Sequence, residues 1–435
     1  MYIPLLLLSL VAAKPPLQYT LRVDSTNLST WSVELRIANA PATFRVAMAA
    51  HPEYDDKYWR YLKDLSVDGG TVTREDSAVW RVVRTGTAVP TLRYRIELPP
   101  APEGRRGSWR PFLSPTGGLL GGPHAFLYVV GAEGDAALVR LVLPASWQVA
   151  TALDRSNDPR RFTAASIDAL MESPILAGHL RQWQFTAGGV PHRVVYWPLP
   201  DAAPFDTAAF VGGVERIARE AIALFGRAPY REYTFLYQDG AYGGLEHPAS
   251  VTLGASSTEL AKGLSDVLAE TAHEFFHTWN LMTIRPAEYR GVDYRTQPPV
   301  AGLWFSEGFT MFSADLLLRR AGLPVADSTR TAHLERLMSR YLFGPGNSHH
   351  SAEAVSRVAY NAEPGSLGDY NASTHLQGEV IAAMLDFVIR GATRGERSID
   401  DVLRLMFTRF SGKPGFQGAD VERSARTVRS PRRCA

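Results

Sequence analysis

The chain has 435 residues, of which 45% are hydrophobic and 21% charged, a composition typical of a globular protein with two or three domains. Its formal net charge is only +2 and no basic stripe crosses the body of the chain, so the composition does not indicate a nucleic-acid partner. The single cysteine, Cys434, excludes an intrachain disulfide and a zinc site built from cysteines.

A short apolar run opens the chain at residues 5–10, and small residues follow it up to Ala13. This pattern predicts a signal peptide over residues 1–13, and hence a secreted or periplasmic protein, although no Lys or Arg precedes the run. A buried N-terminal strand is the alternative. The run is too short to be a stable membrane anchor, and no later segment has transmembrane character.

Residues 14–166 alternate between apolar and polar side chains in several short stretches, which predicts strands. The alternation is clearest at residues 19–23, 31–37 and 92–98, and denser apolar runs that could be core strands lie at 125–130 and 137–143. Pro and Gly clusters separate these stretches. We therefore expect a β-sandwich-like N-terminal domain with no catalytic constellation of its own.

Residues 167–422 have a more helical character and are predicted to form a second domain. Helical spacing is expected at residues 207–225, 334–342, 379–389 and 399–410, and strands at 193–197, 233–237 and 250–253. Gly226 is a natural stop for the first of these helices. Residues 423–435 contain five arginines and no apolar period, so a disordered basic tail is predicted there.

The pattern His-Glu-x-x-His stands out at His273, Glu274 and His277. On a helix predicted from Ser265, as N-cap, through Asn280, the two imidazoles lie on one face and can bind one zinc ion. Glu274 lies beside them, where it can take a proton from a zinc-bound water. The alternative is a pair of hydrogen-bonded core histidines on an ordinary amphipathic helix.

A catalytic zinc needs three protein ligands and one open position, so a third ligand must come from elsewhere. The best candidate is Glu307, thirty residues after His277, which is expected to open a helix that ends near Gly322. A carboxylate that is only stabilised by the helix dipole is the alternative. Asn280 and Asp315 could support the ligands from behind, or could have surface or capping roles.

Two imidazoles and one carboxylate would leave the zinc with residual positive charge, which lowers the pKa of bound water and polarises a substrate carbonyl. Glu274 would accept the water proton and hand it to the leaving amine. The pattern thus predicts a mononuclear zinc hydrolase.

These residues also resemble a known family, the glycyl aminopeptidases, which are zinc metallopeptidases of the gluzincin type with a glutamate as third ligand. The similarity is carried by residues 273–280, 284–286 and 303–310, with weaker matches at 385–390 and 398–402. The upstream stretch Gly243-Gly244-Leu245-Glu246-His247 is similar to the strand on which that family binds substrate. The resemblance covers most of the chain, up to about Glu422.

The resemblance implies an α+β fold, with the β-rich N-terminal domain followed by a thermolysin-like, mostly α-helical catalytic domain. It implies one Zn²⁺ per chain and the removal of small N-terminal residues, Gly or Ala, from peptide substrates. Gly243, Gly244 and Glu246 would bind substrate, and the Glu246 carboxylate would hold the free amine. For Glu246, a loop carboxylate in a Gly-rich turn is the alternative.

The sequence departs from the family in two places. Where the family has a tyrosine pair before Lys-Gly, this chain has Thr374 and His375, so the oxyanion would be stabilised by His375 or by the nearby Tyr370. The C-terminal PDZ domain that often follows in the family is not expected. A weakened or inactive zinc-retaining peptide-binding protein, and an endopeptidase on the same zinc centre, therefore remain alternatives. The oligomeric state is not predicted.

Overall fold

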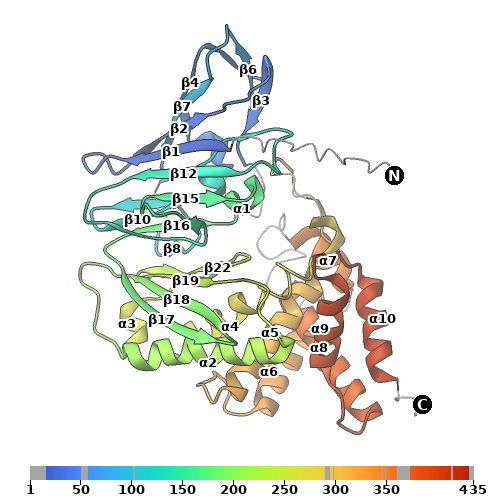
Figure 1. The fold of residues 1–435 in the computed structure, drawn as a ribbon. Coiled ribbons are helices and arrows are strands. Elements are labelled where there is room, and N and C mark those ends of the chain that lie inside the picture. Colours follow the sequence, from blue (N-terminus) through green and yellow to red (C-terminus); the bar gives the residue numbers. More distant parts are fainter. Residues whose placement is uncertain are drawn as a thin grey trace, which may run out of the picture.

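The computed structural model of the protein describes residues 16–49, 57–100, 103–289, 294–296, 298–344, 346–347, 349–359, 373–412 and 415–430. The predicted signal peptide, Tyr370 and Cys434 lie outside the described residues. A β-rich N-terminal part stands above a second part that contains one sheet and most of the helices (Figure 1). The predicted α+β fold class, with a β-rich domain before a mostly helical one, is confirmed.

Three sheets build the N-terminal part. In spatial order the largest consists of β14 (Asp154–Arg155), β15 (Arg161–Ala164), β12 (Ala137–Val142), β1 (Leu17–Val23), β2 (Thr30–Arg36), β7 (Thr91–Glu97) and β4 (Leu62–Asp68). The second consists of β13 (Gln148–Ala150), β16 (Pro174–Gly178), β10 (Gly117–Gly121) and β9 (Phe112–Ser114). The third consists of β11 (Tyr128–Val129), β3 (Thr43–Ala47), β6 (Val79–Arg84) and β5 (Gly70–Arg74). Alternate side chains of β1 and β2 point into a shared apolar core, as the period of two requires.

The structure differs in detail from two sequence-based expectations for this part. Residues 125–130 form only the two-residue strand β11, which follows the 3-10 turn Gly122–His124, because their dense apolar character reflects full burial rather than strand pairing. The N-terminal core also continues past residue 166, where the domain boundary was predicted. Helix α1 (Ile167–Met171) packs into the N-terminal core, and β16 pairs with β10 and β13.

The second part begins with a five-stranded sheet in the order β17 (Arg181–Ala187), β18 (Val190–Trp197), β19 (Tyr233–Gln238), β22 (Ser250–Gly254) and β21 (Gly244–Glu246). Strands β18, β19 and β22 are parallel, and β21 pairs antiparallel with β22 at the sheet edge. Helices α2 (Thr207–Phe225) and α4 (Ser265–Phe276) cover one face of this sheet, with α3 (Ser257–Leu260) at its end. The short pair β8 (Arg106–Gly107) and β20 (Ala241–Tyr242) joins the two parts.

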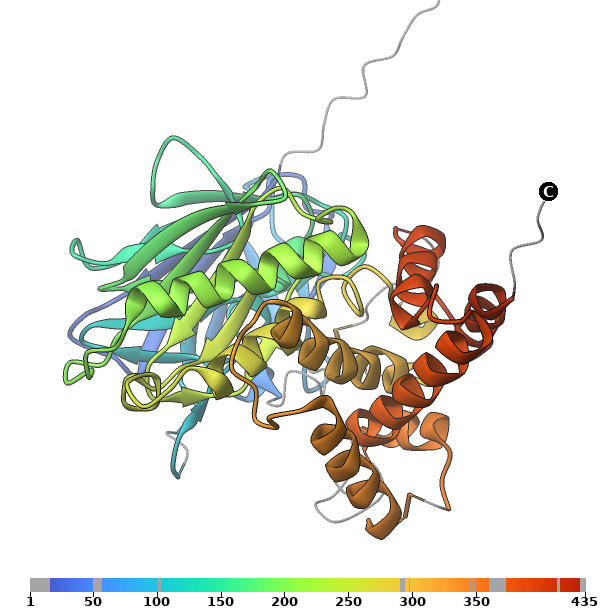
Figure 2. The same ribbon diagram turned by 90° about the horizontal axis from the view of Figure 1, so that it is seen from below.

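The remaining helices lie to one side of the sheet (Figure 2). They are α5 (Leu303–Arg320), α6 (Arg330–Phe343), α7 (Ala352–Val358), α8 (Thr374–Ala392), α9 (Ile399–Phe410) and α10 (Gly418–Arg429). Helices predicted at 207–225 and 399–410 are confirmed with those bounds. None of the described helices is both long and apolar enough to cross a membrane.

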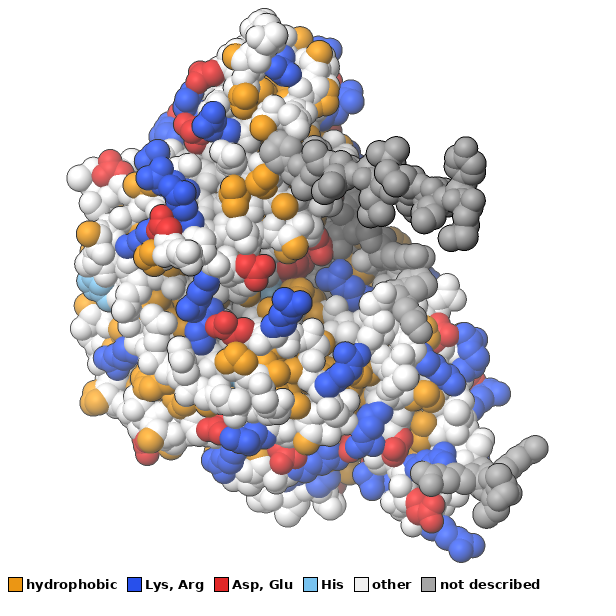
Figure 3. Space-filling model, viewed as in Figure 1, with side chains coloured by type: hydrophobic (Ala, Val, Ile, Leu, Met, Phe, Trp, Pro, Cys, Tyr) orange, Lys and Arg blue, Asp and Glu red, His pale blue; other side chains and the backbone are white. Residues whose placement is uncertain are grey.

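The prediction of a disordered tail from residue 423 is wrong up to residue 429. Helix α10 continues to Arg429 and buries Val421, Ala425 and Val428 in the core that it shares with α9 and α8. These three apolar positions are one or two helical turns apart, but the arginines between them hide the period in the sequence. On the face seen in Figure 3, Lys and Arg side chains are scattered among acidic ones rather than gathered into one stripe.

Helices α5 and α8 cross at a pair of glycines. A Cβ atom on Gly378 would lie 1.9 Å from the backbone oxygen of Trp304, and one on Gly308 would lie 2.1 Å from the carbonyl carbon of Gly378. Only glycine allows the two backbones to approach so closely. The crossing follows Glu307 directly on α5 and lies three residues after His375 on α8, so it determines how these two side chains meet.

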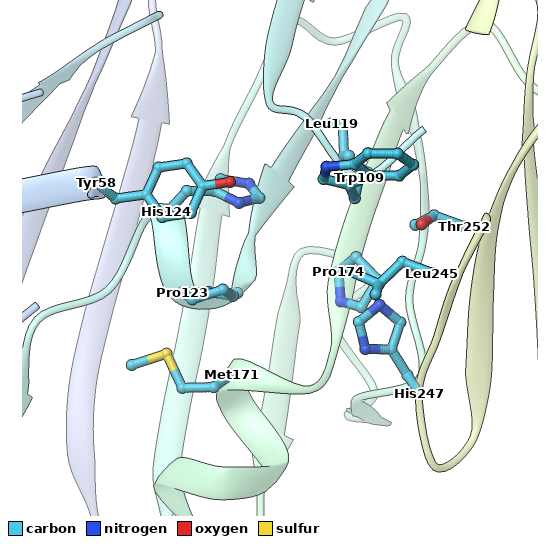
Figure 4. Close-up of a pocket in the computed structure, with 11 residues that line it drawn as sticks. Tyr58, Trp109, Leu119, Pro123, His124, Met171, Pro174, Leu245, His247 and Thr252 are labelled. Carbon is cyan, nitrogen blue, oxygen red and sulfur yellow. The ribbon is translucent and has the colours of Figure 1, made fainter. Parts of the chain in front are cut away.

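A small, tightly lined pocket lies at the junction between the two parts, on the side of β21 that carries Leu245. Figure 4 shows Tyr58 and His124 on one side of it and Trp109, Thr252 and His247 on the other. His124 Nε2 and Thr252 Oγ1 are buried and have no hydrogen-bond partner among the described residues. The nearby His247 Nδ1 lies 3.0 Å from Glu172 Oε2, and this buried contact connects the turn after β21 to the end of α1.

The glycine crossing leads to a prediction for stability. Gly378→Ala should lower the free energy of unfolding by at least about 3 kcal/mol, because the new methyl group overlaps a backbone carbonyl that cannot rotate away. Gly391→Ala on the same helix is the matched control: apart from its own helix, no atom of the described residues lies within 4 Å of the Cβ position, and the substitution should stabilise the fold by up to about 1 kcal/mol. Urea unfolding of both variants measures the difference, and equal stabilities would contradict the close approach.

Burial in this pocket, with a smaller contribution from His247, lowers the pKa of His124 to about 3. An unfolded chain protonates this histidine below about pH 6.5, whereas the folded protein keeps it neutral, so the free energy of unfolding falls as pH falls through this range. His124 should contribute a slope of about 1.4 kcal/mol per pH unit. In urea titrations from pH 7 to pH 4.5, His124→Gln should lose that part of the slope, and the exposed-site control His179→Gln should not. A slope unchanged in His124→Gln would contradict the assignment.

Candidate metal centre

Helix α4 forms because its apolar residues repeat with helical spacing and face the core. The buried set is Val267, Leu268, Ala272, Phe275 and Phe276. The predicted N-cap at Ser265 is wrong, because the N-cap is Leu264 and the Ser265 hydroxyl donates instead to Asp266. The helix ends at Phe276, earlier than the predicted Asn280, and His277 is its C-cap.

Three side chains of the predicted site converge. His273 Nε2 and His277 Nε2 lie 3.0 Å apart, and Glu307 Oε2 lies 3.5 Å and 3.3 Å from them. Among the described residues, these three form a group whose potential ligand atoms all lie within 4.8 Å of one another. Glu307 does not open its helix as expected, because α5 begins at Leu303 and Glu307 lies in its second turn. The helix dipole therefore stabilises the Glu307 carboxylate less than it would at the first turn, which weakens the alternative that Glu307 serves only this purpose.

The spacing of the three atoms fits a bound divalent cation. Donor atoms about 2.0–2.2 Å from a tetrahedral zinc lie about 3.3–3.6 Å apart, close to the separations of 3.0, 3.3 and 3.5 Å found here. His277 Nδ1 lies 3.1 Å from the backbone oxygen of Asn280, so Nδ1–H donates there and Nε2 is the nitrogen that faces the cluster. The two imidazoles and one carboxylate are a donor set that suits zinc.

Asn280 connects the end of α4 to α5. Its side chain is fully buried, and its Nδ2 donates to the backbone oxygens of Phe305 and Ser306 and to Thr310 Oγ1 at 3.0–3.2 Å. It therefore fixes the position of Glu307 relative to His277, and a surface role for Asn280 is excluded. Asp315 lies two turns further along α5, where it accepts hydrogen bonds from Arg319 and Arg330.

Glu274 lies between the histidine cluster and the edge strand. It is 7% exposed, and its Oε2 has no hydrogen-bond partner in the described part of the chain. A Cβ on Gly244 would lie 2.3 Å from Glu274 Cγ, so β21 packs directly on this carboxylate only because residue 244 is a glycine. Burial, and next the Glu246 carboxylate, raise the pKa of Glu274 well above its usual range.

Gly243, Gly244 and Glu246 are thus located beside the cluster. Gly243 has a φ of 69°, which favours glycine, and Glu246 ends the edge strand β21. Burial raises the pKa of Glu246, while the nearby His277 opposes this shift. The Glu246 side chain belongs to a strand rather than to a loop.

His375, which the sequence predicted as a stabiliser of the oxyanion in place of a family tyrosine, also lies at the cluster. Its Nε2 is 3.0 Å from Glu307 Oε2, and its ring stacks on that of His273 at a centroid distance of 5.7 Å. His375, His273 and Glu274 line an open hollow of about 500 Å³. Tyr370 is outside the described residues, so its expected role stays a prediction.

The sequence interpretation missed Glu270, which lines the same hollow one turn before Glu274 on α4. The sequence contained a signal for it: residues four apart lie on the same face of a helix, so Glu270 is expected to face the same side as Glu274. Burial raises the pKa of Glu270.

The electrostatics of the cluster favour a cation. Burial lowers the pKa of His273 to about 4. For His277 burial acts in the same direction, but the Glu307 and Glu246 carboxylates outweigh it and raise its pKa to about 10. Glu307 stays ionised, because His277 and His375 outweigh its burial and hold its pKa well below the usual range.

Two family models match this chain. The model of the M61 glycyl aminopeptidases covers residues 266–380, and the model of the M61 N-terminal domain covers residues 18–179. The chain belongs to the M61 glycyl aminopeptidase family. The predicted resemblance is confirmed, and with it the assignment to the metallopeptidases. In this M61 protein the peptidase match includes the whole His-Glu-x-x-His motif, Glu307 and His375. A search of curated proteins gave no match.

Solved structures of aminopeptidases share the fold of this M61 chain. An aminopeptidase N family protein from Idiomarina loihiensis has a TM-score of 0.82 and 23% identity, covering 94% of this chain and 75% of that one. An M1 zinc metallopeptidase from Deinococcus radiodurans has a TM-score of 0.57 and 15% identity, covering 96% of this chain and 95% of that one. A mutant of that enzyme bound to a Tyr-Ser-Ala substrate has a TM-score of 0.56 at 15% identity, covering 97% and 95%. At these identities the similarity concerns the fold.

The contacts of Asn280 lead to a prediction for the metal-free protein. Asn280→Ala removes the buried hydrogen bonds from Nδ2 to the backbone oxygens of Phe305 and Ser306 and to Thr310 Oγ1, and should lower the free energy of unfolding by about 1–3 kcal/mol. The exposed Asn157→Ala should change it by less than about 0.5 kcal/mol. Urea unfolding in the presence of a chelator provides the measurement, and a neutral Asn280→Ala would show that this bridge does not stabilise the fold.

Proposed function

We propose that this protein is a zinc-dependent aminopeptidase that removes N-terminal Gly or Ala from peptides, with one Zn²⁺ per chain. The observation that carries the proposal is the convergence of His273, His277 and Glu307 beside the buried Glu274. In this proposal His273, His277 and Glu307 are the metal ligands. The preference for small residues rests on the family to which the chain belongs.

When bound there, zinc would lower the pKa of a water molecule and polarise the carbonyl of the peptide bond. Glu274 is placed to act as general base, because its Oε2 has no hydrogen-bond partner among the described residues and burial favours proton acceptance. It would then deliver this proton to the amine that leaves. The close packing of Gly244 keeps Glu274 in position during both transfers.

The edge strand supports exopeptidase activity. A peptide can extend the sheet along the free edge of β21, with Gly243 and Gly244 allowing its backbone to approach. Glu246 ends this strand near His277, so its carboxylate can pair with an N-terminal ammonium and fix the position of the first residue. The related M1 fold bound to a Tyr-Ser-Ala substrate supports a short peptide as ligand.

The proposal includes the division of the chain. We place the N-terminal domain at residues 16–178, because β16 pairs within it, and the peptidase domain at residues 181–429. Export through a signal peptide at residues 1–13 is proposed from the sequence pattern.

Glu274→Gln tests the proposal directly. The variant should still bind one zinc ion, because Glu274 is not a ligand in the proposal, and its kcat should fall by a factor of about 10²–10⁴. Zinc content is measured by atomic absorption, and release of Gly or Ala is followed with free and N-acetylated dipeptide amides. Chelator-treated wild-type protein is the control.

Three results would contradict the proposal. Near wild-type turnover by Glu274→Gln would exclude Glu274 as the base. Equal cleavage of N-acetylated and free peptides would indicate an endopeptidase. Zinc binding without turnover above the Glu274→Gln level for any peptide would indicate a non-catalytic peptide-binding protein.

A further inference from the structure

The cluster contains a third imidazole that the ligand set does not use. His375 lies in the first turn of α8, and its Nε2 is 3.0 Å from Glu307 Oε2. It is not a member of the group of three whose atoms lie within 4.8 Å of one another. His375 therefore contacts the carboxylate of the proposed third ligand without sharing the metal position itself.

The neighbouring Thr374 helps to define which nitrogen carries the proton. Thr374 Oγ1 is 3.4 Å from His375 Nδ1, and Thr374 is buried. If the hydroxyl donates to Nδ1, the proton of the neutral ring is on Nε2 and is donated to Glu307. The opposite tautomer would direct the Nε2 lone pair at a carboxylate oxygen, which is repulsive. The contact is thus a charge-assisted hydrogen bond from His375 to Glu307.

The surrounding helices hold this contact in place. The glycine crossing of α5 and α8 lies one residue after Glu307 and three residues after His375, so both side chains project from backbones in direct contact. The His375 ring also stacks on His273, with an interplanar angle of 19°. Its remaining exposed part, 41% of the side chain, faces the hollow beside Glu274.

We propose that His375 is a positioning residue that fixes the orientation of the Glu307 carboxylate for metal binding. Hydrogen bonds to ligands from outside the coordination sphere fix the geometry of the ligand and raise metal affinity. This inference rests on the proposed function only in assuming that His273, His277 and Glu307 hold a metal ion. It assigns Thr374 and His375, the two residues that depart from the family pattern, a joint role on Glu307 rather than on the substrate oxygen.

Zinc affinity without substrate tests the proposal. In the full chain, His375→Phe retains a ring of similar size but has no donor, and the dissociation constant for Zn²⁺, measured by competition with a chromophoric chelator, should rise about 10–100-fold. His375→Gln can still donate and should lose much less affinity. His179→Phe, at an exposed histidine of the N-terminal part, is the control and should bind zinc like wild type.

Cobalt substitution gives a second readout. The visible spectrum of the Co²⁺-loaded protein should change in His375→Phe, because the geometry of the Glu307 ligand changes. Thr374→Val removes the hydroxyl that orients His375, so it should weaken zinc binding in the same direction and by less. This variant keeps the proposal testable if His375→Phe does not fold.

The outcomes are distinct. Unchanged zinc affinity and an unchanged cobalt spectrum in folded His375→Phe would overturn the proposal. If that variant also loses kcat at unchanged KM, His375 acts on the substrate oxygen instead. If the wild-type protein binds no zinc, the proposed function itself fails. This result comes from the wild-type protein alone, so it is distinguishable from a failure of the His375 proposal.

Discussion

The carboxylate of Glu307 is the point on which the site depends, because one oxygen atom lies within 3.5 Å of three imidazole nitrogens. Its position is not a local property of α5. The Asn280 amide holds the backbone of α5 against the end of α4, and the Gly308–Gly378 contact brings α8 close enough for His375 to reach the same oxygen. The position of the Glu307 carboxylate therefore depends on three helices, α4, α5 and α8. The contacts between these helices are the buried hydrogen bonds of Asn280 and the close approach of two glycines.

Charge at the cluster explains why a cation suits it. Four carboxylates, from Glu246, Glu270, Glu274 and Glu307, are buried or half-buried around the histidine pair. Burying carboxylates without compensation is costly, so part of this charge is neutralised by protons, as the raised pKa values of Glu246, Glu270 and Glu274 indicate. A divalent cation would offset this negative charge more completely than protons do.

The N-terminal domain contributes to the site through the edge strand. Trp109 packs within contact distance of Gly243, and His247, which follows β21, pairs with Glu172 from the N-terminal part. Residues that line the pocket of Figure 4, such as Trp109, therefore pack on one side of β21, and Glu274 packs on the other side. This packing on both sides fixes the position of β21. An aminopeptidase needs a fixed strand there, because the first peptide bond of the substrate must lie at the reactive groups.

The sequence by itself determined the features whose signal is local. The alternation of β1, β2 and β7, the helical periods of α2 and α9, and the one-turn spacing of His273 and His277 are read within a few residues, and the structure has them at those places. The start of α4 at Ser265 was predicted correctly, although its N-cap is Leu264 rather than Ser265. The start of α5 at Leu303 was missed, because its N-cap, Gly302, makes no side-chain capping bond. The prediction that residues 423–429 are disordered failed, because the buried apolar residues of α10 stand among charged ones and their helical period is hard to see in the sequence. The tertiary structure alone decided that Asn280 reaches α5, that Gly308 meets Gly378, and that His375 contacts Glu307, because contacts between residues 25–70 positions apart depend on how helices pack and leave no periodic trace in the chain.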